Sequence, residues 1–205
     1  MPGQQFGQAL APVLFGDTDP SGRLPLTFPA TLEQGPITGP ERWPGTDGDA
    51  RYDEGVLVGY RWYDAHGQEQ LFPFGHGLSY GEYTYGQPSL THDEATGAVT
   101  VSVMVTNTGP RPGSEVIQLY VAAPAAAGQP PKQLKGFARV HLDPGASEEV
   151  TLRLDPGDLA AYDEASGTWV VHPGRYELLV GRSSRDLRGS AGFEVEASRA
   201  RPVVP

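Results

Sequence analysis

The sequence has 205 residues, no cysteine and a formal net charge of −10. This length allows one large domain, or one domain and part of another. The acidic charge disfavours nucleic acid and anionic membranes as partners, because both bind basic patches. The absence of cysteine excludes disulfides and thiolate metal sites. Twenty prolines and 27 glycines argue against long helices and predict short strands joined by turns.

The first 29 residues predict a fragment of an α/β unit. Apolar residues at positions 6, 10, 13 and 14 predict a short amphipathic helix over 4–15. The segment RLPLTFP (23–29) alternates in polarity and predicts a short strand, of edge type because of Pro25. One helix and one strand cannot form a core alone. The chain is therefore expected to begin within a domain.

The N-terminus carries no pattern of a leader. Residues 1–10 lack the basic and apolar regions of a signal peptide. No apolar stretch approaches the roughly 20 residues that a membrane helix needs. Localisation stays open on these grounds, with the cytoplasm favoured over secretion.

Residues 30–85 predict an irregular linker and interdomain segment. The part over 30–51 is rich in proline, glycine and aspartate without a period, which indicates a linker or a loop that lines a site. The part over 52–80 contains YDEGVLVGYRWYD and LFPFGHGLSY, which mix aromatic, charged and glycine residues. Aromatic faces can stack on sugar rings while charged groups bond the hydroxyls. This part is therefore a candidate sugar-facing segment, or the seam between two structural units.

Residues 86–197 predict an antiparallel β-sandwich of the fibronectin type III-like kind. Short alternating runs are separated by turns throughout, and no cysteines are present for an immunoglobulin-type bridge. In one run, the valines at 99, 101, 103 and 105 are expected to face a core. The tail over 198–205 is expected to be disordered. The fold class is thus mainly β, with a partial α/β segment and a linker before the sandwich. The predicted strands lie near 88–92 and over 97–109, 114–124, 134–142, 148–155, 167–174, 176–184 and 189–197.

Five residues are candidates for contact with a sugar at the rim of a site: Tyr52, Glu54, Arg61, Trp62 and His76. Each also has a structural interpretation. Glu54 and Arg61 could form salt bridges between domains, Tyr52 and Trp62 could pack at an interface, and His76 could be a satisfied structural group. The basic segment KQLKGF (132–137) is a candidate interdomain contact.

Other chemistries find no support in the residue patterns. The histidines have no ligand-like spacing, and no glycine motif has the lysine and hydroxyl residue of a phosphate loop, so neither a metal nor another cofactor is expected. Asp53 and Glu54 are adjacent and would point to opposite faces of a strand, while Asp17 and Asp19 suit a turn. No catalytic residue is therefore assigned. The sandwich shows no clear set of aromatics on one exposed face, as a carbohydrate-binding module would.

Four segments together resemble the C-terminal part of a glycoside hydrolase family 3 enzyme of the β-glucosidase type. They are PGQQFGQALAPVLFGDTDPSGRLPLTFP, YDEGVLVGYRWYD, LFPFGHGLSY, and the run from PKQLKGFARVHLDPG through DLAAYDEASGTWVVHPGRYELLVGRSSRDL. The resemblance implies the end of an α/β sandwich domain followed by a fibronectin type III-like domain. It also implies retaining hydrolysis of a β-linked glucoside or oligosaccharide.

The same resemblance implies that the chemistry lies elsewhere. The family's nucleophile belongs to a (β/α)8 barrel and its acid/base glutamate to the α/β domain before the PGQ segment, and neither region is in this sequence. Where the family has PGQEGG, Gln5 stands in place of the glutamate. The chain is therefore expected to be inactive alone and to need a barrel domain or a second chain. The alternatives are a truncated gene, a split enzyme, or a stand-alone carbohydrate-binding or scaffold module.

Overall fold

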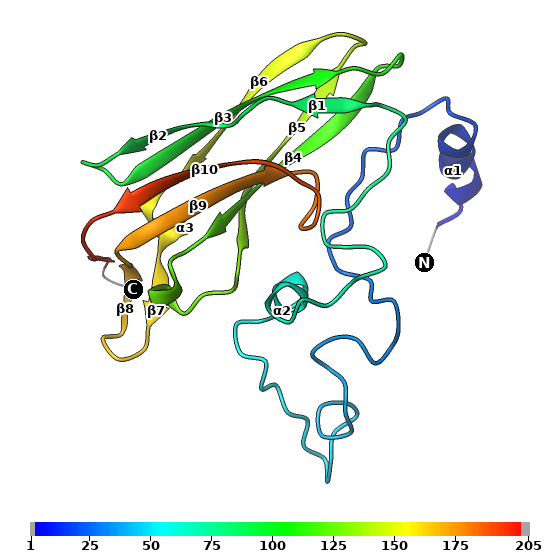
Figure 1. Ribbon diagram of the computed structural model, residues 1–205. Helices are drawn as coiled ribbons and strands as arrows, with labels where there is room; N and C mark the ends of the chain where they lie inside the picture. Colours follow the sequence, from blue (N-terminus) through cyan, green and yellow to red (C-terminus); the bar gives the residue numbers. More distant parts are fainter. Residues whose placement is uncertain (1–2, 202–205) are drawn as a thin grey trace.

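The computed structural model describes residues 3–201. A β-sandwich fills the C-terminal part, and the segment before it winds along one end and side of the sandwich (Figure 1). The helices are α1 (Phe6–Leu14), α2 (Tyr60–Ala65), the 3-10 turn η1 (Ala125–Ala127) and α3 (Pro156–Leu159). The strands are β1 (Tyr83–Tyr85), β2 (Ser89–Asp93), β3 (Ala98–Asn107), β4 (Gly113–Ala122), β5 (Gln133–Leu142), β6 (Ser147–Leu154), β7 (Ala161–Asp163), β8 (Thr168–Val171), β9 (Gly174–Gly181), β10 (Leu187–Val195) and β11 (Arg199–Arg201).

All strand pairs are antiparallel, and they form two main sheets. In the first sheet β3 pairs with β1 and β2 along one edge and with β6 along the other. The second sheet has the order β10-β9-β4-β5. A small third sheet, β11-β8-β7, closes one end. Short strands with alternating burial give this arrangement because each main sheet can bury only one face.

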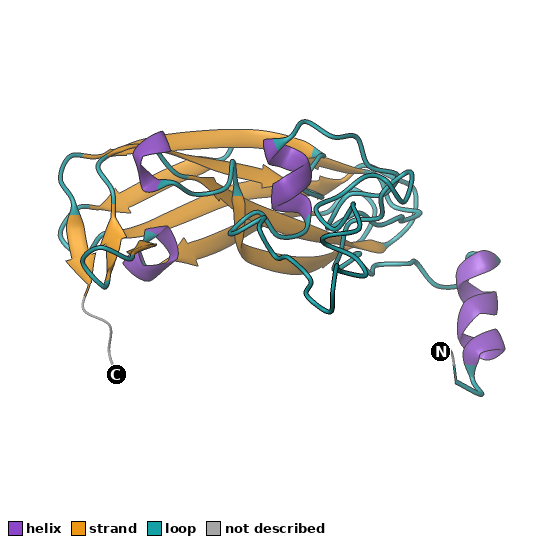
Figure 2. Cartoon of the chain, turned by 90° about the horizontal axis from the view of Figure 1, so that it is seen from below, coloured by secondary structure: helices purple, strands orange, loops and turns teal. Residues whose placement is uncertain are grey.

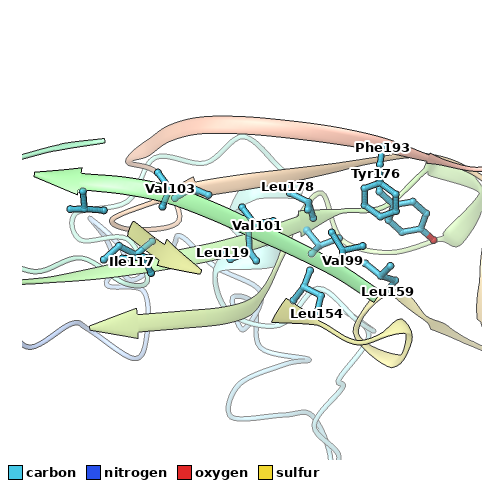
Figure 3. Packing of buried hydrophobic residues seen from close by; sticks show 14 of the residues in the cluster. Val99, Val101, Val103, Ile117, Leu119, Leu154, Leu159, Tyr176, Leu178 and Phe193 are labelled. Atoms are coloured by element: carbon cyan, nitrogen blue, oxygen red, sulfur yellow. The ribbon is translucent and has the colours of Figure 1, made fainter. Parts of the chain in front are cut away.

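The core lies between the two main sheets, as Figure 3 shows. Val99, Val101, Val103 and Val105 are all buried, while Met104 between them is exposed, which confirms the predicted alternation of β3. They pack against apolar residues of β4, β9 and β10 from the facing sheet. The predicted fold class is confirmed.

The N-terminal segment differs from its predicted form in three places. The predicted strand over 23–29 does not form, because Pro25 and Pro29 lack the N–H that a ladder needs. Backbone hydrogen bonds at Leu24 and Phe28 tie it to 71–76, such as the bond from Phe28 N to Phe72 O at 2.8 Å, but they form only one isolated bridge, between Phe28 and Phe72. Helix α2 and strand β1 lie in the region predicted to be irregular. A helix of six residues shows too little of its period to be recognised in sequence.

The predicted first helix is present as α1, but it has no buried residue. It lies away from the sandwich, beyond the loops of the N-terminal segment (Figure 2). Its apolar side chains Phe6 and Leu14 are more than half exposed.

The predicted disordered tail is wrong over 199–201, since β11 pairs with β8 there. Residues 202–205 of that predicted tail lie outside the described residues. Within 3–201, no helix is long and apolar enough to cross a membrane.

Candidate functional site

The five candidate residues do not converge on one pocket. Arg61 lines a groove of about 640 Å³ between α2 and the loop that follows residue 25. His76 lines a different, shallower groove, where its ring lies 5.3 Å from that of Phe72. Trp62 stacks on His66, the residue after its helix, at 4.3 Å between ring centroids. Tyr52 is 80% exposed, and neither Glu54 nor Arg61 forms an ion pair with another residue of the described part.

The structure instead concentrates aromatic packing on the buried side of α2. Tyr60 and Tyr63 are three residues apart, so they lie on one side of the helix, and both are buried. The Tyr60 ring stacks on Phe74 at 4.7 Å and meets Tyr120 of β4 edge-on at 6.0 Å. The Tyr60 hydroxyl accepts a hydrogen bond from the backbone N–H of Leu134 at 2.7 Å. This part of the segment thus forms a seam with the sandwich, while its place between two domains stays a prediction.

Asp64 provides the charged contact between α2 and the sandwich. Its carboxylate is only 4% exposed. Lys132 donates to Oδ2, and Arg185 Nε lies 3.1 Å from Oδ1. Arg185 also donates through Nη2 to the carbonyl oxygens of Tyr63 and Gln68. Lys132 and Leu134 of the segment 132–137 both contact α2, and that this is a contact between domains stays a prediction.

Glu115 of β4 provides a second charged contact, in which the carboxylate belongs to the sandwich and a cation to the segment before it. It is fully buried and lies between Arg23 of the N-terminal segment and Arg182 of the sandwich. Arg23 Nη2 donates to Oε1. Arg182 Nε lies 2.7 Å from Oε2, in an ion pair without the alignment of a hydrogen bond. Because this carboxylate is buried with a guanidinium group beside each oxygen, a substrate has no access to it.

Asp19 joins three separate stretches of chain. Its Oδ1 accepts hydrogen bonds from Ser79 Oγ at 2.8 Å and from the N–H of Tyr80 at 2.7 Å. Its Oδ2 accepts from the N–H of Ser114 at 3.2 Å. The sequence predicted a simple turn former at this position, whereas the structure gives Asp19 a role in attaching the turn to β4.

The polar backbone of the loop over 71–80 also bonds to the sandwich. Gln118 of β4 donates through Nε2 to the carbonyl oxygen of Gly75 at 3.1 Å, and Tyr120 donates to Gln118 Oε1 at 2.6 Å. The N–H of Ser184 donates to Phe74 O at 2.9 Å. Burial raises the pKa of Tyr120 well above its ordinary value, so its hydroxyl remains a donor across the working pH range.

No arrangement of metal ligands is present in the described residues, where no group of three His, Asp or Glu side chains converges. Lys135 lies close to Lys132 and is half-buried, and this burial lowers its pKa. The site is therefore a contact zone built from aromatic faces and the three carboxylates of Asp19, Asp64 and Glu115. Each carboxylate accepts at least one hydrogen bond, while Asp64 Oδ1 and Glu115 Oε2 have only an ion-pair contact.

Two family models match the chain, in an order that agrees with its architecture. The glycosyl hydrolase family 3 C-terminal domain matches residues 1–80, and the fibronectin type III-like domain matches residues 115–184. The chain belongs to glycosyl hydrolase family 3. The first model runs past residue 29, the predicted end of the α/β remnant, and the division at residues 29, 85 and 197 stays a prediction.

Similar proteins place the chain in the C-terminal part of the family's enzymes. A β-glucosidase of Rhizobium radiobacter is 47% identical over 198 residues, which are 95% of this chain and 24% of that protein. A β-glucosidase of Streptomyces venezuelae, solved in complex with D-glucose, has a TM-score of 0.87 and 40% identity over 95% of this chain and 25% of its own. β-Glucosidase 3B of Thermotoga neapolitana, in complex with α-D-glucose, has a TM-score of 0.88 at 38% identity, covering 98% of this chain and 28% of its own. The chain thus spans about a quarter of the length of these relatives.

The sequence carried a signal for Glu115 that our expectations did not use. In SEVIQLYV, Glu115 has the same parity as Ile117 and Leu119, which face the core. A carboxylate at a core-facing position implies buried cationic partners. Asp64 had no comparable signal, because its burial depends on a helix that the sequence does not reveal.

Proposed function

We propose that this chain is the C-terminal portion of a retaining β-glucosidase-like glycoside hydrolase, which hydrolyses the O-glycosyl bond of a β-linked glucoside or oligosaccharide. The observation that carries the proposal is the match of nearly the whole chain to the C-terminal quarter of β-glucosidases, at up to 47% identity among the relatives described. Two structural relatives hold glucose, which supports a glucoside as the substrate class.

We further propose that the chain alone is inactive. A retaining enzyme needs two carboxyl groups about 5–5.5 Å apart, one of them free to attack and the other free to donate a proton. The buried carboxylates of this chain, Asp64 and Glu115, are instead neutralised by cations. Asp53 is exposed, and the hydrogen bond from Arg42 lowers its pKa, which is the wrong direction for a proton donor.

The role of the chain in the complete enzyme is support of the catalytic part and formation of the outer rim of the sugar site. Tyr52, Glu54, Arg61, Trp62 and His76 are the proposed rim residues. Large apolar side chains are exposed along the N-terminal segment, and such a surface usually contacts another protein surface. We propose that a barrel domain, in the same protein or as a second chain, covers it. These side chains include Phe6, Leu14, Phe15, Leu26, Leu32 and Ile37.

A direct test uses an aryl β-glucoside and two proteins. The first is the purified chain, which we expect to show no turnover. The second is a chimaera in which this chain replaces the matching C-terminal quarter of the Rhizobium radiobacter β-glucosidase, which we expect to hydrolyse the substrate. Turnover by the chain alone that is abolished by Glu54→Gln would refute its inactivity, and a folded but inactive chimaera would count against the proposed role.

A stand-alone carbohydrate-binding module is the second candidate, and one observation favours it. Tyr162 and Trp169 lie directly opposite each other on β7 and β8, with ring centroids 5.6 Å apart, and both are nearly half exposed. The sequence showed no such set, yet paired aromatics on one strand face can stack on sugars. Titration of the chain with glucan oligosaccharides, and of Trp169→Ala as control, would distinguish the two. Binding that Trp169→Ala abolishes would favour the module.

A further inference from the structure

Helix α2 is fastened to the sandwich through one carboxylate, that of Asp64. Its two oxygens receive different cations, Lys132 from the residue before β5 and Arg185 from the turn after β9. Strands β5 and β9 are the two neighbours of β4 within one sheet, so the two cations come from opposite sides of strand β4. The bonds from Arg185 to the carbonyls of Tyr63 and Gln68 fix the C-terminal half of the helix and the turn after it.

The rest of α2 carries two of the proposed rim residues and contacts the segment of a third. Arg61 lines the groove beside the loop of Leu26 and Ile37, and Trp62 is its neighbour. Tyr60 stacks on Phe74, two residues before His76. A rotation of α2 would therefore displace the rim residues of both grooves together.

We propose that Asp64 is a positioning residue, which sets the orientation of α2 and through it the places of Arg61, Trp62 and His76 at the sugar rim. This inference rests on the proposed function. A buried ion pair adds little net stability compared with apolar packing, but it can select one arrangement of the groups around it. Lys132 donates a hydrogen bond to Oδ2, and Arg185 Nε lies 3.1 Å from Oδ1 in an ion pair without the alignment of a hydrogen bond. With these two cations in place and 4% exposure, the Asp64 carboxylate has one favourable orientation.

The first experiment uses the chimaera with the Rhizobium radiobacter β-glucosidase and compares two substrates in the same sample. The ratio of kcat/KM for cellobiose to kcat/KM for an aryl β-glucoside does not depend on the fraction of folded enzyme. We expect Asp64→Asn to change this ratio about tenfold, since a misplacement near 1 Å can alter rates by up to about a hundredfold. Lys132→Met, which leaves the Arg185 contact in place, should change it in the same direction.

Asp186→Asn is the matched control. Asp186 is next to Arg185 and pairs with Arg188 at 2.6 Å, and no hydrogen bond or ion pair joins its side chain to α2 within the described residues. The control should leave the ratio unchanged. A lower melting temperature for Asp64→Asn and Lys132→Met with an unchanged ratio would mean that Asp64 is only structural, and would overturn the proposal.

The second experiment needs no catalysis and uses the 205-residue chain itself. Hydrogen exchange should accelerate at least tenfold in Asp64→Asn for the amides of His66, Gln68 and Gly75, which close α2 and the loop beside it. The amides of β3 and β4 should keep their rates. If the unsubstituted chimaera is inactive, the proposed function fails separately, and unchanged exchange in Asp64→Asn still overturns the positioning role.

Discussion

Replacing Glu115 by glutamine should strongly destabilise the chain, and the expected magnitude follows from the burial of its partners. Glutamine keeps the shape of the side chain but removes the negative charge between Arg23 and Arg182. The two guanidinium groups are only 9% and 22% exposed, so water cannot replace the lost carboxylate. Removing one partner of such a buried arrangement costs about 3–5 kcal/mol. We take about 3 kcal/mol, because the glutamine oxygen can still accept one hydrogen bond.

Urea unfolding followed by tryptophan fluorescence and by circular dichroism measures this loss. In thermal unfolding, a protein of this size loses about 2–4 °C of melting temperature per kcal/mol, so the melting temperature should fall by about 6–12 °C. Glu194→Gln is the control, because its pair with Arg175 is exposed and 3.8 Å long, and such pairs contribute no more than about 1 kcal/mol. The loss for Glu115→Gln should change little with added salt, because buried pairs are weakly screened.

A triple variant separates the loss of charge balance around Glu115 from a loss of packing. If the penalty comes from uncompensated cations, then Glu115→Gln combined with Arg23→Met and Arg182→Met should recover most of the lost stability. A single-variant loss below about 1 kcal/mol would show that the three groups are not buried together as the structure has them. Failure of the triple variant to recover any stability would assign the loss to packing rather than charge.

Three further predictions concern single residues. Gly75→Ala should destabilise the chain by at least about 1 kcal/mol in urea unfolding, since Gly75 has a φ of +81° and an added Cβ would lie 2.2 Å from Gln118 Oε1. Gly128→Ala is the control, because Gly128 has a φ of +60° and free space around it. It measures the cost of the backbone strain without the contact. Tyr60→Phe should cost about 1–3 kcal/mol by leaving the Leu134 N–H without its acceptor, and an unchanged urea midpoint would contradict that bond. Burial lowers the pKa of Lys135 from 10.5, so the unfolded chain binds more protons than the folded chain as the pH approaches that value. The free energy of unfolding should therefore rise with pH in this range. Lys135→Met should abolish this rise, and an equal rise in both proteins would refute the burial of the ammonium group.

The sandwich could be predicted from sequence because its signal is local and repeated. In β3, four buried valines alternate with Thr100, Ser102 and Met104, which are not buried, and this alternation indicates a strand with one face in the core. Gly145 and Gly167 adopt positive φ values at turns between strands, where glycine is favoured. These features are each contained within about ten residues of chain.

The seam could not be predicted in the same way, because its partners are far apart in sequence. Asp64 meets Arg185 across 121 positions (185 − 64), and no periodic pattern links such residues. Residue type predicts sugar contacts for Trp62 and Tyr52, but Trp62 stacks on His66 and Tyr52 faces solvent. Their role at a sugar rim stays a prediction.

In the charged contacts of the seam, each side supplies one carboxylate and at least one cation to the other side. This limits how the family's domains can be recombined. Asp64 lies before the sandwich and depends on cations within it, whereas Glu115 lies within the sandwich and depends on Arg23 before it. A crossover near residue 82 with an unrelated sandwich would leave uncompensated charge on each side of the junction. Exchange is expected to succeed when Arg23, Asp64 and the sandwich travel as one block, or when compensating substitutions accompany it. Natural variation at these positions should therefore be correlated across the junction.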